Sequence, residues 1–200
     1  MVKKIVIASH NKGKVQEIHR IFSAAIGQVE ILTLDDFPEI SEIEETGESF
    51  EENALLKAAT VFKLTNIPAL ADDSGLVIDH LGGAPGIYSA RYSGEGDLGN
   101  IRKVLDQLDS VARQDRSARF VAVAVYIDES GPLFARGELE GEITLEPRGE
   151  NGFGYDPIFQ PVNYSQTLAE LDPTIKDQIS HRGVSLNQLA PALAVRLGQK

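Results

Sequence analysis

The chain has 200 residues, 42% of them hydrophobic, which is enough to build the core of one compact domain. The absence of cysteine excludes disulfides, Cys-ligated metal centres and a thiol nucleophile, and it suits a reducing cytoplasm. A net charge of −11 without a basic run argues against a nucleic-acid partner, and no apolar stretch reaches the roughly 18 residues of a membrane span. A small phosphorylated ligand is compatible with this charge, because a few local cations and a divalent metal reverse the field inside a cleft.

Hydrophobic periodicity predicts alternating strands and helices along the first half of the chain. The predicted elements are, in order, a strand at 2–8, a helix from residue 11 to Ile26, a strand at 29–34, an acidic loop at 35–47, a helix at 50–64, strands at 69–71 and 76–79 separated by a turn at 72–75, and tight turns at 82–86. Ser49 followed by Glu52 is a capping-box pattern, in which each side chain binds a backbone amide at the start of the helix at 50–64.

The second half of the chain continues the alternation. It predicts a helix at 98–108, strands at 119–128 and 133–145, a turn-rich segment at 151–157, and helices over 168–197 with a break at 180–183. Residues 120–127, FVAVAVYI, are apolar on both faces, which is typical of a central strand. Because no internal repeat or linker interrupts this pattern, we expect one mixed α/β domain over residues 1–200.

The strongest local signal for chemistry is the segment Asp72-Asp73-Ser74-Gly75. Carboxylates that follow an apolar strand lie where α/β folds bind ligands, and Mg²⁺ prefers one or two such oxygen ligands together with phosphate and water. For an isolated DDSG, an ordinary Asx turn is the more frequent explanation. A second acidic cluster lies at 44–52, where helix capping explains the members inside the helix. Glu45 lies outside the helix, so it is the better candidate for a second metal ligand.

Cations and small polar residues occupy the junction between the first strand and the first helix. The segment Ser9-His10-Asn11-Lys12-Gly13-Lys14 offers amides, a hydroxyl and lysines where a phosphate is readily held, although it lacks the leading glycine and the GK[ST] ending of the P-loop. Lys57 lies four residues after Asn53, so both side chains project from one helix face and could reach the same ligand. A solvated surface pair explains this spacing equally well.

Two further segments carry residue types that recognise a planar base. The segment Gly152-Phe153-Gly154-Tyr155-Asp156 combines permissive glycines, two aromatic rings and an acid, which suits stacking of a base and reading of its edge. An ordinary aromatic-packed turn is the alternative. Lys176, His181 and Arg182 place donors around the expected helix break, an arrangement suited to recognising a carbonyl or a phosphate.

Taken together, these segments resemble the Ham1/RdgB-like inosine triphosphate pyrophosphatase family over nearly the whole chain. The resemblance rests on the order and spacing of the motifs IASHNKGKVQEI, EETGESFEENALLKA, LADDSGLVIDHLGGAPGIYSARYSG, GFGYDPIF and KDQISHRGVSL. It implies an ITPase-like α/β fold, in which a long curved mixed sheet and flanking helices form two lobes around a central groove, and it implies a homodimer. It also implies Mg²⁺-dependent hydrolysis of a non-standard purine nucleoside triphosphate, such as dITP or XTP, to the monophosphate and pyrophosphate.

The resemblance further implies a role for each candidate residue. Phosphate contacts would come from Ser9, His10, Asn11, Lys12, Gly13, Lys14 and Lys57. Glu45 and Asp73 would hold Mg²⁺, Asp73 would also activate the water, and Ser74 would touch the substrate. The base and the nearby phosphate would be contacted by Phe153, Gly154, Tyr155, Asp156, Lys176, His181 and Arg182. His10 stands where many relatives carry glycine or asparagine, so its effect on phosphate affinity is open.

As a mechanism, we expect water to attack the α-phosphorus while pyrophosphate leaves, with Asp73 either accepting the proton of the water or only orienting it. A 6-oxo purine accepts a hydrogen bond where adenine donates one, so donors such as His181 and Arg182 favour it over ATP. The same argument does not exclude GTP. Two alternatives stay open: a related pyrophosphatase with another base preference, such as modified pyrimidines or dUTP, and a nucleotide-sensing module that binds without hydrolysis.

Overall fold

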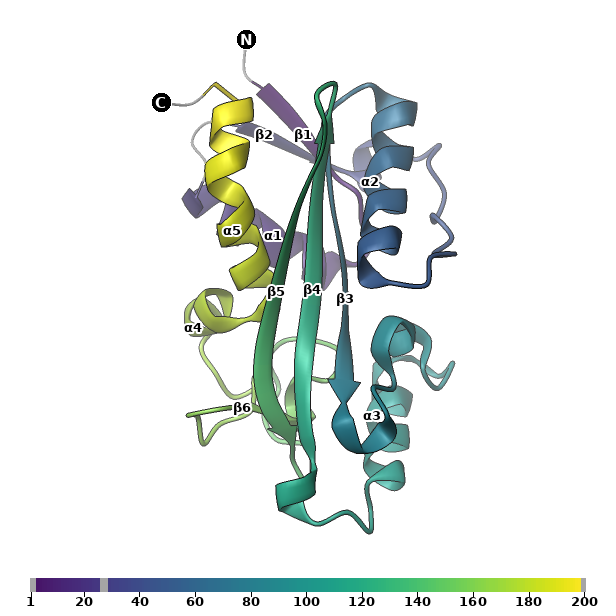
Figure 1. Ribbon diagram of the computed structural model, residues 1–200, viewed down its shortest axis with the longest axis vertical. Helices are drawn as coiled ribbons and strands as arrows, with labels where there is room; N and C mark the ends of the chain where they lie inside the picture. Colours follow the sequence, from purple (N-terminus) through teal and green to yellow (C-terminus); the bar gives the residue numbers. More distant parts are fainter. Residues whose placement is uncertain (1–2, 26–28, 199–200) are drawn as a thin grey trace. The chain divides into compact units, whose positions relative to one another are not determined.

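The computed structural model describes residues 3–25 and 29–198, and it contains one six-stranded sheet with the strand order β2-β1-β3-β4-β5-β6 (Figure 1). The strands are β1 (Lys3–Ile7), β2 (Val29–Thr33), β3 (Ala69–Ile78), β4 (Ser117–Asp128), β5 (Gly131–Ile143) and β6 (Phe159–Pro161). The α-helices are α1 (Lys12–Ala25), α2 (Phe50–Thr65), α3 (Gly96–Gln107), α4 (Pro173–Ile179) and α5 (His181–Arg196). The predicted mixed sheet with flanking helices is confirmed. Among the described helices, none combines the length and the apolar character needed to cross a membrane.

The chain forms two compact units, each assembled from separate segments. The first unit comprises the described residues of Met1–Asp73, Ala122–Gly137 and Arg182–Lys200, and the second comprises Ser74–Val121 and Glu138–His181. Strands β3, β4 and β5 each contribute residues to both units. The single domain that the sequence pattern predicts stays a prediction, and so does the central groove that the resemblance implies.

The first unit is built on the parallel part of the sheet. Strand β1 pairs in parallel with β2, where Val6 lies opposite Leu32, and with β3, where Val6 lies opposite Ala69. Helices α1 and α5 share one hydrophobic core with these strands, formed by Ile5, Ile7, Leu70, Ile18, Phe22, Leu186, Leu189 and Leu193. In Figure 1, α2 lies on the other side of the long strands from α5. Each face of β3 is therefore covered by a different helical element within this unit.

Side chains determine where α1 and α2 begin. Asn11 Oδ1 accepts a hydrogen bond from Lys14 N at 3.0 Å and so caps α1, while Ser49 Oγ accepts one from Glu52 N at 3.2 Å and caps α2. The other half of the predicted capping box is wrong, because Glu52 accepts its hydrogen bond from Glu48 N, at 2.7 Å, instead of from the cap residue. Backbone amides at a helix start lack intrahelical partners, and the flexible glutamate reaches one residue further back to satisfy one.

Helix α3 forms the core of the second unit. Its apolar face packs with residues of the sheet and of the turn-rich segment, namely Ile101, Val104, Leu108, Leu76, Ile78, Phe120, Ile143, Tyr155 and Phe159. Arg116, which is 2% exposed, closes the end of this helix. Its guanidinium donates to the carbonyl oxygens of Leu108, Val111 and Thr144, so carbonyl dipoles solvate this buried cation.

The turn predicted at 72–75 is wrong, because β3 runs without interruption from Ala69 to Ile78. An Asx turn forms when a short acidic side chain satisfies nearby backbone amides. Asp72 and Asp73 bind side-chain cations instead, so their backbone stays in the sheet ladder. The carboxylates consequently lie within a strand and not at its end.

The boundaries of the C-terminal helices also differ from the prediction. Residues 168–172 precede α4, whose first residue, Pro173, follows the capping side chain of Asp172. The break predicted at 180–183 is confined to Ser180, whose extended backbone (φ −65°, ψ 153°) ends α4, and α5 begins immediately afterwards. Val2 and Ile26, which the sequence places in the first strand and first helix, lie outside the described residues.

Two glycines with similar backbone angles provide a test of packing in this fold. Gly149 (φ +83°) and Gly131 (φ +93°) both adopt conformations that favour glycine, but a Cβ at Gly149 would lie 2.5 Å from the carbonyl oxygen of Ala169, whereas a Cβ at Gly131 would meet nothing within 4 Å. We expect Gly131→Ala to cost about 1–2 kcal/mol from backbone strain alone. Gly149→Ala should cost about 1–3 kcal/mol more, because the backbone of Ala169 cannot move aside freely. Urea denaturation of both variants measures the difference, and equal costs would show that the segment at 149 repacks easily.

Candidate active site

The pleat of β3 separates the two carboxylates of the DDSG segment. Successive side chains of a strand point to opposite faces, so Asp72 shares a face with Leu70, which belongs to the core of α1 and α5. Asp73 points to the other face, toward Lys57 of α2. Two adjacent acids therefore serve two different charge clusters in the first unit.

On the first face, Asp72 Oδ2 accepts hydrogen bonds from Nε and Nη2 of Arg182, both at 3.1 Å. Nη1 of Arg182 donates to Glu17 Oε2, and Lys14 Nζ lies 3.5 Å from Asp72 Oδ2. Arg182 is only 2% exposed and Asp72 is also 2% exposed. This buried network joins the start of α5 to β3 and α1. The guanidinium of Arg182 is thus bound to two carboxylates of the protein. The predicted contact of Arg182 with substrate stays a prediction.

The charges of this network shift one another's protonation. Burial opposes ionisation of Asp72, but Arg182, Lys14 and Lys57 together outweigh burial and hold the pKa of Asp72 below its usual range. For Lys14, burial dominates and lowers the pKa of the ammonium despite the attraction of Asp72. A lysine that is desolvated in this way gains the most from an additional anion, such as a phosphate.

On the second face, Lys57 Nζ donates to Asp73 Oδ1 and to Glu45 Oε1, each at 2.9 Å. Asn53, one turn earlier in α2, is fully buried and accepts a hydrogen bond from Gly47 N at 2.8 Å, which fixes the loop that carries Glu45. The interpretation of Asn53 and Lys57 as a solvated surface pair is wrong, because Lys57 is also buried. The structure therefore brings Glu45, Lys57 and Asp73 together, from a loop, a helix and a strand.

Protonation of the second cluster follows from its burial and its excess of acids. Burial raises the pKa of Asp73, Glu45 adds to this, and Lys57 and Lys14 offset it only in part. Burial would lower the pKa of Lys57, but the carboxylates of Asp73, Asp72 and Glu45 outweigh burial and raise it. Burial is thus the main cause of the raised pKa of Asp73, whereas the surrounding carboxylates cause the raised pKa of Lys57.

The donor set of this cluster fits a hard divalent cation. Asp73 Oδ2 is buried and has no hydrogen-bond partner within the described part of the chain, although its sister oxygen binds Lys57. Glu45 and Asp73 supply the one or two carboxylates that Mg²⁺ usually takes from protein when phosphate and water complete its coordination. Across the described residues no group of three or more acids or histidines is arranged to hold a metal by protein ligands alone. Glu45 and Asp73 therefore fit a divalent cation whose remaining ligands are phosphate and water.

The junction between β1 and α1 is locally ordered. Ser9 Oγ accepts from Asn11 N at 3.2 Å, and Asn11 in turn caps Lys14 N. The side chains of His10 and Lys12 are exposed, whereas Lys14 is half-buried and points toward Asp72. Of the predicted phosphate-binding segment, the structure thus brings Lys14 into the charge cluster and leaves His10 and Lys12 at the surface.

In the second unit, the structure brings Phe153, Asp156 and Lys176 together. Asp156 Oδ2 accepts from Lys176 Nζ at 2.6 Å and from Phe153 N at 2.9 Å, and Lys176 Nζ lies 5.0 Å from the centre of the Phe153 ring. Tyr155 is 4% exposed and belongs to the core, with its hydroxyl donating to Ser89 O at 2.8 Å. Its ring therefore anchors the loop, and a contact between Tyr155 and a base stays a prediction.

The remaining predicted residues of the second unit lie in different settings. His181 stacks on Phe120, with ring centres 4.6 Å apart and planes inclined by 9°. Ser74 follows Asp73 in β3 and is half-buried. His181 is buried and begins α5, directly after the helix break at Ser180.

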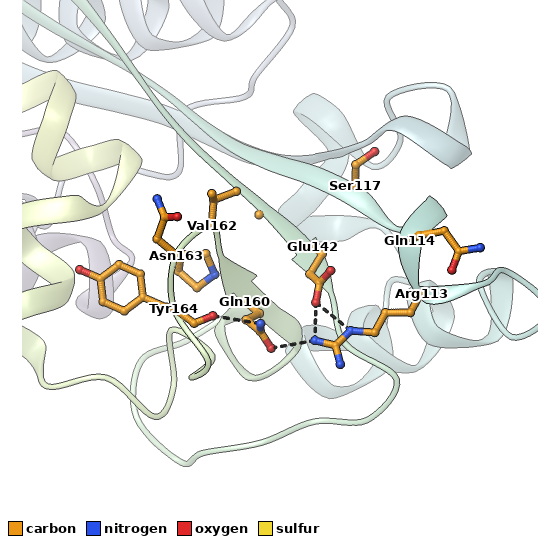
Figure 2. A pocket seen from close by; sticks show the side chains of 10 residues that line it. Arg113, Gln114, Ser117, Glu142, Gln160, Val162, Asn163 and Tyr164 are labelled. Carbon is orange, nitrogen blue, oxygen red and sulfur yellow. Dashed lines mark hydrogen bonds and ion pairs between the residues drawn. The ribbon is translucent and has the colours of Figure 1, made fainter.

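A cavity of about 280 Å³ lies elsewhere in the second unit, against β6 and the end of β5 (Figure 2). Its lining contains none of the predicted site residues. Figure 2 shows that its polar groups bind one another: Arg113 donates to the Glu142 carboxylate at 2.5 and 2.9 Å, and Gln160 Nε2 donates to the backbone carbonyl oxygen of Tyr164 at 3.0 Å. Glu142 belongs to β5 and Gln160 to β6, so these contacts support the edge of the sheet. Because its lining contains no predicted site residue, we do not assign the cavity to the candidate site.

Sequence patterns did not single out Glu17, the buried acid that binds Arg182. Its only signal is a position next to Ile18, on the apolar side of a helix, where a charged residue needs a partner. The partner lies 165 residues away, which local spacing does not show.

The buried pairing of Arg182 leads to a prediction about stability and acid unfolding. Arg182→Met should lower the free energy of unfolding at neutral pH by about 3–5 kcal/mol, because Asp72 and Glu17 would be left buried without this cation. Since the folded-state pKa of Asp72 lies below its unfolded value, its stabilising contribution is present above the unfolded pKa and is lost as pH falls. The stability difference between the parent protein and the variant should therefore shrink on acidification, because protonated Asp72 no longer needs this cation. Urea and acid titrations test both effects.

Arg136→Met is the matched control for this variant. Arg136 Nη1 lies 2.7 Å from Glu51 Oε1, but the two side chains are 47% and 43% exposed, so the loss should stay below about 1 kcal/mol. If the two arginine variants lost the same stability, the buried network would not be the source of the effect.

Comparison with known proteins agrees with this architecture. A model of the Ham1 family matches residues 5–192. The dITP/XTP pyrophosphatases of Bacillus anthracis and Oceanobacillus iheyensis are 48% and 49% identical to the chain, with 94% of this chain and 95% and 96% of the relatives covered. The solved Ham1 proteins of Coxiella burnetii and Staphylococcus aureus cover 98% and 97% of the chain and 100% of their own, at 44% and 40% identity and TM-scores of 0.86 and 0.84. The chain belongs to the Ham1 family.

Proposed function

We propose that this chain hydrolyses non-standard purine nucleoside triphosphates, with dITP and XTP as the representative substrates, to the monophosphate and pyrophosphate. The observation that carries the proposal is the cluster of Lys57 and Asp73, which are buried, with the half-buried Glu45, in which Asp73 Oδ2 has no hydrogen-bond partner among the residues that the structure describes. The names of relatives that are about half identical, dITP/XTP pyrophosphatases, support the substrate class. The lysine of the cluster suits a polyphosphate, and its carboxylates suit the divalent cation that accompanies a polyphosphate.

The chain's own residues divide the chemical work. Lys14 and Lys57, whose ammonium groups are desolvated, would bind the triphosphate and offset the charge that develops on the leaving pyrophosphate. Asp73, held by Lys57, would accept the proton of the water while the oxygen of that water bonds to the α-phosphorus and the bond from this phosphorus to the bridging oxygen breaks. Glu45 and Asp73 would hold Mg²⁺, which when bound neutralises phosphate charge. Ser9, Asn11, Gly13 and Ser74 would contribute further substrate contacts.

The base would be recognised in the second unit. Phe153 would stack on the purine, and donors such as Lys176 and His181 would pair with a 6-oxo group. A donor that is left without a partner against adenine costs about 1–3 kcal/mol, which corresponds to roughly ten- to hundredfold discrimination per contact. Lys176 donates a hydrogen bond to the carboxylate of Asp156, and this contact orients the Lys176 ammonium over the Phe153 ring. We further propose that the protein acts in the cytoplasm as a homodimer, which sizing by light scattering would test.

A substrate panel tests the proposed specificity. Pyrophosphate release should be at least about tenfold faster for dITP and XTP than for ATP, dTTP and UTP, and it should depend on added Mg²⁺. Turnover of pyrimidine triphosphates at the same rate as dITP would favour the related pyrophosphatase with another base preference. Tight binding of nucleotide without any release of pyrophosphate would favour a sensing module.

The variant Asp73→Asn tests the role of this carboxylate. Turnover of dITP should fall by about 10²–10⁴-fold, as expected for loss of a proton acceptor, while nucleotide binding persists. The fold should tolerate the amide, since burial already disfavours the charged form of Asp73. Asp79→Asn is the matched control, because Asp79 follows the end of the same strand and is exposed, and it should retain full turnover. Unchanged turnover in Asp73→Asn would remove Asp73 from the mechanism.

A further inference from the structure

The loop that carries Phe153 depends on two carboxylates for its shape. Gly152 and Gly154 adopt φ values of +78° and +59°, and the amides of Phe153 and Gly154 each bind an acid. Phe153 N donates to Asp156 Oδ2 and Gly154 N donates to Asp97 Oδ2, each at 2.9 Å. Asp156 belongs to the loop itself, whereas Asp97 belongs to α3, 57 residues away. Asp97 is therefore an external anchor for consecutive loop residues.

Helix α3 provides a rigid base for this anchor. Asn100, which is 2% exposed, accepts hydrogen bonds from the amide and hydroxyl of Ser93 at 2.7 and 2.8 Å, and its Nδ2 donates to Ser89 O at 3.2 Å. The same Ser89 carbonyl oxygen accepts from the Tyr155 hydroxyl at 2.8 Å. Helix α3 and the Phe153 loop are thus joined directly, through Asp97 to Gly154, and indirectly, through Asn100 and Tyr155, which both donate to the carbonyl oxygen of Ser89.

Stabilisation of the helix dipole is the simplest explanation of an acid in the first turn of α3. That explanation requires no contact with a distant segment, and an exposed carboxylate would satisfy it while pointing into water. Asp97 is exposed but directs one oxygen to Gly154 N. A charged acceptor forms one of the stronger hydrogen bonds available to a backbone amide, so this contact restrains the loop more than a neutral acceptor would.

We propose that Asp97 is a positioning residue that fixes Phe153 and Gly154 for recognition of the purine base. This inference rests on the proposed function, in which Phe153 stacks on the base. Asp97 acts through the loop and does not touch the substrate. Its loss lets Phe153 and Gly154 sample other conformations, so that part of the binding energy is spent on ordering them.

Kinetics separate this role from the electrostatic effect of the same acid. Removing a negative charge from a protein with net charge −11 should by itself favour a polyphosphate and lower KM. Loss of the anchor should instead raise the KM for dITP in Asp97→Ala, by about tenfold, and leave kcat within about twofold. Asp97→Asn, whose side-chain oxygen can accept the same hydrogen bond, should return KM to within about threefold of the parent. Asp106→Ala, which removes an exposed acid from the same helix, measures the charge effect alone.

Hydrogen exchange of the loop gives a readout that does not depend on turnover. The amide of Gly154 should exchange about tenfold faster in Asp97→Ala than in the parent protein, and Asp97→Asn should restore slow exchange although it also lacks the charge. Faster exchange and a raised KM together support the proposal. Exchange and KM that both stay at the parent values in Asp97→Ala would overturn it. If the loop loosens but neither the parent nor any variant turns over dITP, the anchor stands while the proposed function fails.

Discussion

Burial of adjacent carboxylates on the two faces of β3 is the constraint to which the rest of the first unit conforms. An ionised acid inside a protein needs cations and hydrogen-bond donors, and the strand pleat sends Asp72 and Asp73 in opposite directions. Each face must therefore supply its own partners. Arg182 and Lys14 come from helices on one face, and Lys57 comes from α2 on the other. The positions of these helices are tied to the charges as well as to the apolar core.

The pKa values of the two acids are shifted in opposite directions, because cations outweigh burial at Asp72 and burial outweighs cations at Asp73. On the first face Arg182, which donates two hydrogen bonds to Asp72 Oδ2, lowers the pKa of Asp72 together with Lys14 and Lys57 although burial opposes ionisation, so this acid is a stable structural anion. On the second face burial keeps the pKa of Asp73 raised. Each of the two acids has one buried oxygen without a hydrogen-bond partner among the described residues, so it is the direction of the pKa shift that separates the two faces. A buried acid beside a lysine, such as Asp73, costs folding free energy, and perturbed groups of this kind are typical of functional sites.

The second unit uses polar contacts to shape a loop instead of a charge cluster. Asp156 is shared by Lys176 and by the amide of Phe153, and the hydroxyl of Tyr155 reaches the backbone of Ser89. The aromatic rings of the loop consequently divide their roles, because Tyr155 is buried in the core and Phe153 is left half-buried beside a cation. In this unit the polar groups of the loop are bound within the protein, and the Phe153 ring stays partly accessible.

The sequence by itself determined the alternation of strands and helices, the cap at Ser49, the central strand FVAVAVYI and the motifs of the family, because periodicity, capping and motif spacing are local properties. It also placed Glu45 outside the helix and close in sequence to Lys57. Only the tertiary structure decided that Asp72 and Asp73 stay within one strand on opposite faces, that Glu17 and Asp72 share Arg182, and that Tyr155 is core. These outcomes depend on partners up to 165 residues away, and a buried charge is satisfied by whichever cation the fold brings near, which no local pattern specifies.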